Sequence, residues 1–493
     1  MKVLLVYPHF PDSFWSFKHA LSFVGKRAAQ PPLGLMTIAS LLPANWEKRL
    51  VDTNVERLTD RQLAWADVVF LSGMQIQSEH LLAIVERCRQ RGLRTVVGGP
   101  ITSSLSAEII GTDHVVIGEA EELIATLASH LEAGTALPVY QALERPAMEL
   151  SPMPDFSLIR KNRYNTMTIQ YSRGCPFNCE FCDIIEIYGR RPRTKAVAQV
   201  LAELDQLYAE KWRGPVFIVD DNLIGNKIRA KLLLAALVEW NAAHDNCFHF
   251  ITEASLNLAD DPELLHLMQA ASFTSVFLGI ETPDELGLTS VNKLQNTNRS
   301  LLDSVATIQS YNIEVMAGFI LGFDTDREGA FENMINFIQK SGIPVSMVGL
   351  LQAMPGTQLF RRLTKEGRIL DAGSGNNTSI SLNFLPRMDS ERLIAGYRAV
   401  LQRIYAAEPY YERVRLFLSR CQPRHYSGIT YASIRAFALS VVRMGVFSRD
   451  RWSYWRFLLQ AATRYRNNFG LAMTLAVMGH HFRIMTARMQ ESG

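Results

Sequence analysis

The stretch SRGCPFNCEFCDI, residues 172–184, directs the interpretation of the whole chain. It follows the strand-like run TMTIQYS and places Cys175, Cys179 and Cys182 in a C-x3-C-x2-C pattern, and the next histidine, His244, is more than 60 residues away. A structural zinc site normally closes with four Cys or His ligands, and a four-iron cube takes one thiolate per iron. Three thiolates therefore indicate a cube with one iron open to a non-protein ligand, with structural zinc as the alternative.

Composition indicates a globular protein of more than one domain. The chain has 493 residues, 48% of them hydrophobic, which is enough for two or three domains with sizeable cores. Six cysteines are too few for a disulfide framework at this length, and three lie within eight residues, which favours a reducing compartment and metal chemistry. The other three, Cys88, Cys247 and Cys421, are expected to be buried small hydrophobes.

Both ends of the chain bear on its location. The run MKVLLVYPHF predicts a buried first strand rather than a secretion signal, because its apolar part is short and no small-residue cleavage site follows. From Asp389 to Gly493 there are 16 arginines and no lysine against six acidic residues, a local charge of +10 in a chain of net charge +3. We expect a cytoplasmic protein with a distinct basic region.

The first 145 residues alternate between strand and helix patterns. Continuous apolar strands separated by helices favour an α/β fold with a parallel, doubly wound (Rossmann-like) sheet. Such sheets bind ligands at the carboxyl ends of their strands. The loops expected there are Ser72-Gly73, Gly98-Gly99 and Gly118-Glu119, where glycine would let a large ligand approach or would serve a plain connection.

A second alternation begins after a proline-containing segment. About six strand–helix units follow, which is short of a full eight-stranded barrel and predicts a partial, TIM-like one. The expected organisation is a first domain at 1–145, a linker at 146–165, a partial barrel at 166–375 and a basic helical region at 376–493. The cysteine loop would lie at the barrel mouth, where such folds keep their active sites.

The cysteine spacing, with an aromatic residue before the last cysteine, resembles the signature of the radical S-adenosylmethionine (SAM) enzymes. In that family the open iron is chelated by the amino and carboxylate groups of SAM, and an electron from the [4Fe–4S] cluster cleaves the sulfonium. The resemblance implies contacts to the SAM amino group, to its ribose or carboxylate, and to its adenine at successive strand ends. The matching residues are Asp220, Asp221 and Asn222, then Glu253 and Ser255, then Gly279, Glu281 and Gly318.

A doubly wound domain ahead of such a barrel resembles the cobalamin-binding subclass, which includes methyltransferases and a few cyclases. The segments that match are Pro31–Leu35, Gly98–Pro100 and Gly118–Glu121. The D-x-H-x-x-G motif that supplies a cobalt ligand in many cobalamin proteins is absent, so neither His9 nor His114 is expected to bind cobalt. The resemblance implies cobalamin beside the Ser72, Gly98 and Gly118 loops, with no histidine below the metal.

Nearly the whole chain resembles the branch that contains the hopanoid carbon-2 methylase. The resemblance implies radical methylation of an unactivated carbon in an apolar polycyclic or isoprenoid-type substrate. It also implies an external electron donor of the flavodoxin or ferredoxin type and no nucleic-acid partner. The alternatives are an oxidative cyclase of the porphyrin type, which shares both domains, and a non-catalytic cobalamin or iron–sulfur sensor.

The C-terminal hundred residues combine apolar helical faces with arginine and aromatic residues. The plainest interpretation is a helical cap packed on the barrel, with arginine stems covering its rim. The functional interpretations are a lid over a large apolar substrate and a peripheral contact with anionic lipids on the inner face of the membrane.

Overall fold

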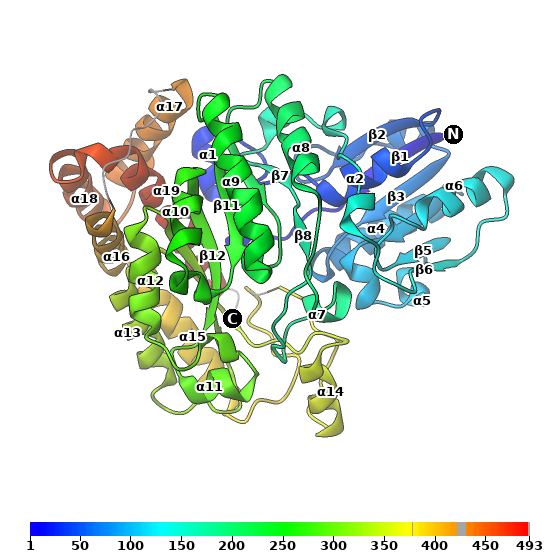
Figure 1. Ribbon diagram of the computed structural model, residues 1–493. Coiled ribbons are helices and arrows are strands. Elements are labelled where there is room, and N and C mark those ends of the chain that lie inside the picture. The colour runs from blue at the N-terminus through cyan, green and yellow to red at the C-terminus, as the bar shows by residue number, and fades with distance from the viewer. Residues whose placement is uncertain (377, 422–429, 492–493) are drawn as a thin grey trace.

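The N-terminal part of the protein folds around a six-stranded parallel sheet with strand order β2-β1-β3-β4-β5-β6 (Figure 1). The computed structural model describes residues 1–376, 378–421 and 430–491. The strands are β1 Lys2–Tyr7, β2 Glu47–Asp52, β3 Val68–Ser72, β4 Arg94–Gly98, β5 His114–Ile117 and β6 Val139–Gln141. The chain crosses over between β1 and β3, which is where a doubly wound sheet opens a ligand crevice.

Helices cover both faces of this sheet. Helices α2 (Leu33–Leu41) and α6 (Ile124–Ala133) pack in one core cluster, and α3 (Asp60–Trp65) and α4 (Ser78–Arg89) pack in another on the opposite face. The strands between them are buried on both sides, which accounts for their continuous apolar sequences. The predicted Rossmann-like architecture is confirmed.

The middle of the chain forms a second parallel sheet whose six strands follow sequence order from β7 to β14. The strands are β7 Met167–Ile169, β10 Pro215–Ile218, β11 His249–Ala254, β12 Phe273–Glu281, β13 Glu314–Leu321 and β14 Val345–Leu350. The helices between them are α8 Val197–Ala209, α9 Lys227–Ala243, α10 Pro262–Ala270, α11 Glu285–Ser290, α12 Leu301–Ser310 and α13 Ala330–Ser341. β7 and β14 remain the edges of the sheet, so the predicted partial barrel is confirmed.

The C-terminal region is helical, as expected. It contains α14 Gln358–Lys365, α15 Ser390–Tyr405, α16 Ala407–Arg420, α17 Tyr431–Ser440, the π-helix η10 Val441–Val446, α18 Arg451–Thr463 and α19 Phe469–Glu491. Helix α15 packs on β14 and α13, so it completes the sixth strand–helix unit of the barrel.

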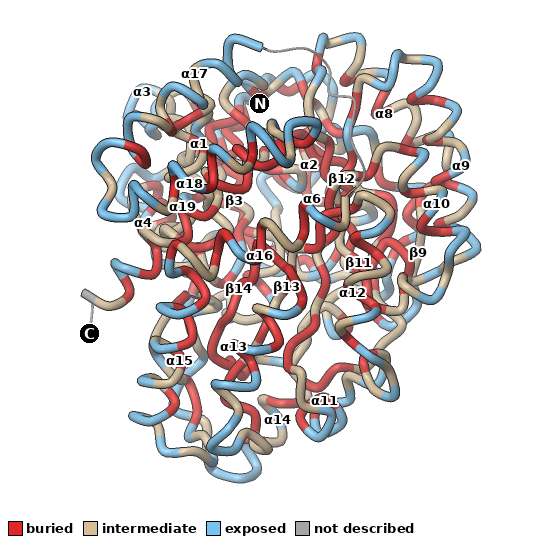
Figure 2. Tube along the Cα trace, turned by 90° about the vertical axis from the view of Figure 1, so that its left-hand side faces the viewer, coloured by how far each residue is buried: buried red, intermediate tan, exposed pale blue. Residues whose placement is uncertain are grey.

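The domain boundaries predicted at residues 145, 165 and 375 stay predictions, because one hydrophobic core runs through both the barrel and the C-terminal helices (Figure 2). Among the described residues, no helix has the length and hydropathy needed to cross a bilayer.

The carboxyl ends of the two sheets face each other. After β3, Gln75 Nε2 donates a hydrogen bond to the carbonyl of Gly373, in the loops beyond β14, at 3.0 Å. After β5, the carboxylate of Glu119 pairs with Arg173, which follows β7. These contacts place the predicted cofactor loops of the first sheet against the mouth of the barrel.

The segment between β1 and α2 also reaches across to the barrel. It carries η1 (Phe14–Ser16) and α1 (Lys18–Val24), and α1 packs on α17 and α19. The ring of Trp15 lies 4.7 Å from that of Phe277 on β12, measured between centroids. The N-terminal segment therefore closes one side of the barrel.

Candidate active site

Two short antiparallel strands, β8 (Ser172–Arg173) and β9 (Arg193–Thr194), form a hairpin. The cysteine loop follows β8 and leads into α7 (Ile184–Ile187), so both lie between the two strands of this cysteine hairpin. All three of its cysteines are free thiols. In the described part of the chain, no three Cys, His, Asp or Glu side chains are arranged to hold a single metal ion. A cube is bound differently, because each of its thiolates ligates a separate iron.

Backbone geometry fixes the entry to this loop. Gly174 adopts φ +94°, and a Cβ at this position would lie 2.8 Å from the carbonyl oxygen of Gly189, so the position requires glycine. The Gly174 N–H donates a hydrogen bond to the carboxylate of Asp221 at 3.0 Å, and the Cys175 N–H donates one to the carbonyl of Gly189 at 3.2 Å. The first cysteine is thereby held from both sides.

Polar donors surround the sulfurs. Asn222 Nδ2 lies 3.8 Å from Cys175 Sγ, and Gln295 Nε2 lies 3.6 Å from Cys179 Sγ. Burial raises the pKa of the Cys175 and Cys182 thiols, while the ammonium group of Lys293 acts in the opposite direction. Amide and ammonium groups stabilise the negative charge that sulfur carries when it ligates iron, so this donor set fits a thiolate-bound cluster.

The two predicted aspartates after β10 are largely used by the protein itself. Asp220 accepts hydrogen bonds from the Tyr171 N–H at 2.8 Å and from the Ser172 hydroxyl at 2.6 Å. Burial raises the pKa of Asp220 to about 6 and that of Asp221 to about 7. Both carboxylates shape the strand that leads into the cysteine loop.

The polar residues at the carboxyl ends of β10 and β11 divide into two groups. Asn222 and Ser255 bond each other: Asn222 Nδ2 is 3.1 Å from Ser255 Oγ, and the Ser255 N–H donates to Asn222 Oδ1 at 3.2 Å. The carboxyl group of Glu253 has no hydrogen-bond partner among the described residues. Burial, followed by the charges of Asp221 and Asp220, raises its pKa to about 8. Its carboxyl group is therefore available to a ligand, and a cationic ligand would favour its ionised form.

Alternate residues of β12 and β13 face the barrel lumen. The ring of Phe319 on β13 contacts that of Phe337 on α13, so this face of β13 packs against the helices. Side chains alternate along a strand, so Met316 and Gly318 lie on the opposite face, toward the lumen. Phe277 pairs with Met316 and Gly279 pairs with Gly318 in register. These inward residues are only half-buried, so this part of the lumen wall is partly accessible and combines apolar side chains with glycines.

Glu281 and Lys293 span the lumen beside the cysteines. Their ion pair is 2.8 Å long, and a Cβ at Gly279 would collide with both charged ends. Burial lowers the pKa of Lys293, but Glu281 and Cys179 more than offset this effect and keep it charged. Glu281 adopts φ +68°, a conformation that non-glycine residues rarely take.

The structure brings the predicted cobalamin loops together at adjacent strand ends. A Cβ at Gly99, where φ is +86°, would collide with the Ser72 hydroxyl, and the Ile101 N–H donates to the Gly73 carbonyl at 3.0 Å. Gly98 ends β4, and Gly118, with φ +87°, follows β5. Gly98, Gly99 and Gly118 thus leave bare backbone at this edge, with the Ser72 hydroxyl packed close to Gly99 and Ala142 packed close to Gly118. Bare backbone fits the close approach of a large group.

Three other groups of the first domain make contacts within the protein. Glu119 is buried and pairs with Arg173 at 2.6 Å and with Arg193 at 2.5 Å, so it fastens the first domain to the cysteine hairpin. His114 is buried, with Nδ1 2.8 Å from the Leu137 carbonyl. His9 is exposed, and its backbone N–H donates a hydrogen bond to Nδ1 of His80.

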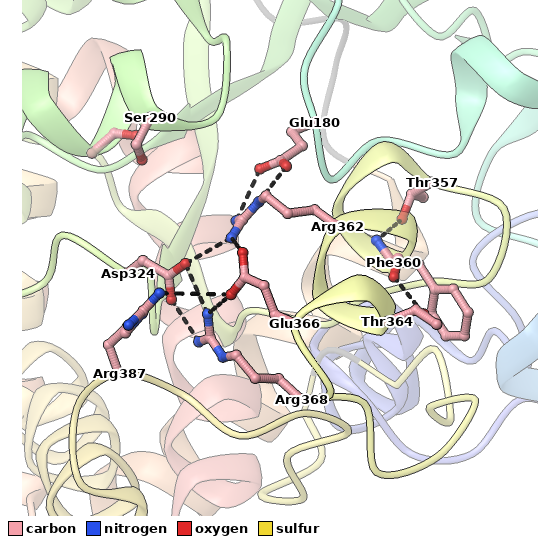
Figure 3. A network of polar contacts seen from close by, with 11 residues as sticks. Glu180, Ser290, Asp324, Thr357, Phe360, Arg362, Thr364, Glu366, Arg368 and Arg387 are labelled. Carbon is pink, nitrogen blue, oxygen red and sulfur yellow. Dashed lines mark hydrogen bonds and ion pairs between the residues drawn. The ribbon is translucent and has the colours of Figure 1, made fainter.

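Sequence reasoning missed a clamp between the cysteine loop and α14 (Figure 3). Arg362 binds Glu180, the residue after Cys179, with Nε–Oε1 at 2.6 Å and Nη2–Oε2 at 3.2 Å. Arg362 Nη1 also lies 2.9 Å from Asp324, which Arg368 holds from the other side. In addition, the Leu359 N–H donates to the Glu180 carbonyl. The only sequence signal was the acidic residue inside the cysteine motif.

Comparisons with known proteins agree with this geometry. Successive parts of the chain match a B12 binding domain (27–128), the radical SAM superfamily (169–338) and a domain of unknown function (357–492). An uncharacterized methyltransferase of Synechocystis sp. is 40% identical over 98% of this chain and 91% of that protein. The hopanoid C-2 methylase of Rhodopseudomonas palustris is 35% identical over 98% and 93%. The radical SAM methyltransferase TsrM of Kitasatospora setae, solved with cobalamin and a [4Fe-4S] cluster, superposes with a TM-score of 0.58 at 15% identity, covering 100% of this chain and 99% of that one.

A cobalamin-type sheet that faces a three-cysteine β/α barrel defines a cobalamin-dependent radical SAM enzyme. Because relatives at 40% and 35% identity span almost its full length, the chain belongs to the cobalamin-dependent radical SAM methyltransferases. Its cofactors are a [4Fe–4S] cluster, SAM and cobalamin. Cys175, Cys179 and Cys182 would hold the cluster, and the Gly98–Gly99 and Gly118 edge would receive cobalamin.

Replacing Arg362 by Gln leaves the largely buried Glu180 carboxylate without its cation and should loosen the cysteine loop. We expect reconstituted R362Q to bind less iron and sulfide and to cleave SAM about 10- to 100-fold more slowly, the usual cost of removing a partner just outside a metal site. Iron content and the visible absorption of the cluster measure the effect. The matched control is R361Q on the same helix, whose partner Glu186 is 37% exposed at its side chain. Equal cluster loss in both variants, or in neither, would contradict a specific role for the clamp.

Proposed function

We propose that this enzyme methylates an unactivated carbon of an apolar, polycyclic isoprenoid lipid, and that carbon 2 of a hopanoid is its target. The observation that carries the proposal is the 35% identity to a hopanoid C-2 methylase along 98% of the chain. The side chains of Phe277 and Met316, with Trp15 beside them, support it, because they offer an apolar wall.

The protein's own residues serve to position and exclude rather than to transfer protons. When bound, cluster, SAM and cobalamin together supply hydrogen abstraction and methyl transfer. Glu253 is the carboxylate left free to bind the cationic amino group of SAM, because Asp220 and Asp221 are occupied by hydroxyl and backbone donors. Ser255, Gly279, Glu281 and Gly318 form the remaining SAM surface. The facing carboxyl edges of the two sheets keep water from the gap between the cofactors.

Product mass tests this function most directly. We expect the anaerobically reconstituted enzyme, given reductant, cobalamin, CD3-labelled SAM and a hopanoid, to form 5′-deoxyadenosine and a hopanoid with one CD3 in place of a hydrogen. A dehydrogenated or cyclised product without label would favour the cyclase. No 5′-deoxyadenosine from protein with an intact cluster would favour the sensor.

The C-terminal helices support a contact with membrane lipid, from which such a substrate would come. The tail face, which we define as the exposed surface of α17, η10 and α18, displays a cluster of large apolar side chains. They are Tyr431, Ile434, Phe437, Val442, Val446, Phe447, Trp452, Trp455 and Leu459. Arg449 and Arg451 are exposed beside them, a combination suited to the headgroup region of anionic lipids. The tail face lies on the far side of the molecule from the first sheet (Figure 1).

Removing two apolar anchors should release the protein from lipid. Phe447 and Trp452 are 79% and 74% exposed, so replacing both by Ser should barely affect folding. We expect the wild type to float with vesicles containing anionic phosphatidylglycerol and the double variant to stay in the soluble fraction. The control is L286S on α11, at a position 64% exposed. Flotation that is unchanged in the double variant, or absent in the wild type, would refute the contact.

A further inference from the structure

A cationic groove opens outside the cysteine loop. Its volume is about 780 Å³, and its walls come from residues 145 and 147–149, from residues 191–194, and from residues 225–229, where η7 (Leu223–Gly225) ends and α9 begins. The lining contains five cationic side chains and one acidic one. They are Arg145, Arg191, Arg193, Lys227 and Arg229, against Glu149. The positive charge is a local feature, because residues 1–388 carry a net charge of −7 when the +10 of the tail is subtracted from +3.

Several of these cations are not neutralised within the protein. Arg193 is paired with Glu119, and Lys227 Nζ lies 3.9 Å from Asp261. Within the part of the chain that the structure describes, the side chain of Arg145 binds only backbone carbonyls, those of residues 186 and 187. Arg191 and Arg229 are exposed and have no hydrogen-bond or ion-pair partner for their side chains among the described residues. The groove therefore presents at least three unpaired positive charges to solvent.

A single residue, Pro176, separates the groove from Cys175, which is expected to ligate the cluster. Gly225 lines the groove, and a Cβ there would lie 3.2 Å from the ring of Pro176, the neighbour of Cys175. Arg190 Nη2 also donates to the Pro176 carbonyl at 3.3 Å. The same turn that carries Gly225 begins at Asn222, whose amide reaches Cys175 Sγ. The groove floor is thus the outer wall of the cluster site.

We propose that this groove docks an acidic one-electron carrier protein and that the electron enters the cluster beside Cys175. The proposal rests on the function above, since it requires a cluster that must be reduced before each SAM cleavage. In the transfer the carrier is oxidised by one electron and the cluster is reduced by one electron, and no atom or proton is exchanged. Positive charge around an electron-entry point steers an acidic carrier and speeds encounter.

The surface also has the features of a transient redox interface. Ile228 is 77% exposed at the edge of the groove and provides an apolar anchor among the cations. Electron-transfer complexes are typically small, below about 1,200 Å² of buried surface, and depend on charge more than on area. A carrier seated here would approach the cluster without entering the barrel, so it would not compete with substrate or cobalamin.

Reversing the charge of two groove arginines tests docking of the carrier separately from SAM cleavage. In cluster-loaded R191E/R229E, we expect the rate of 5′-deoxyadenosine formation with reduced flavodoxin at low salt to fall about tenfold or more, the scale of electrostatic steering. With dithionite, a small reductant that needs no docking surface, the rate should equal that of the wild type. The matched control is R61E/K340E, which makes the same charge change at exposed positions on α3 and α13.

A binding measurement keeps the test independent of turnover. Calorimetric titration of cluster-loaded protein with flavodoxin should show binding that weakens with salt, is lost in R191E/R229E and persists in R61E/K340E. Flavodoxin binding to R191E/R229E as tightly as to the wild type would overturn the proposal, as would an equal loss of the dithionite-driven rate. A wild type that binds flavodoxin but cleaves no SAM with either reductant would instead overturn the proposed function.

Discussion

Three thiolates on a loop that supplies no fourth are the constraint on which the rest of this structure depends. A loop that leaves one iron to a substrate must be held by its surroundings, because it lacks the closure that a fourth ligand gives. The protein provides this support from three directions. Asp221 binds the backbone N–H just before Cys175, Arg362 binds the acidic residue just after Cys179, and Glu119 binds the arginines of the flanking hairpin. Each support comes from a different part of the chain.

The third support explains how the two α/β units work as one enzyme. Glu119 belongs to the carboxyl edge of the first sheet, where cobalamin is expected, and its partners Arg173 and Arg193 belong to the cysteine hairpin. The ion pairs are largely buried, so loss of either partner would leave an uncompensated charge inside the protein. They join the edge where cobalamin is expected to the cluster loop, and the N-terminal segment with Trp15 covers one side of the barrel. The order of the cofactors therefore follows from how the sheets meet.

The sequence predicted the architecture well because both sheets carry strong local signals. Buried parallel strands are continuous apolar runs, and the helices between them show clear one-sided burial, so the doubly wound sheet and the six-strand barrel could both be anticipated. The cysteine motif was equally easy to recognise, since its spacing is local.

The roles of single polar residues were harder to predict from the sequence. Asp220 and Asp221 were expected as SAM contacts, and their backbone and hydroxyl partners became visible only in three dimensions, as did the free carboxylate of Glu253. Arg362 lies far from Glu180 in sequence, and no local pattern links them. Trp15 meets Phe277 through an insertion that crosses between domains, a contact that periodicity does not encode.

The central claim is that the cluster has one iron reserved for SAM. Electron paramagnetic resonance of the anaerobic, dithionite-reduced protein tests it most directly, with spectra recorded before and after SAM is added. We predict a [4Fe–4S]⁺ signal that changes its g-values when SAM binds and that is lost when Cys175, Cys179 or Cys182 is replaced by Ala, while C247A retains it. A cluster whose spectrum is indifferent to SAM, or a protein that holds zinc in place of iron, would contradict the account.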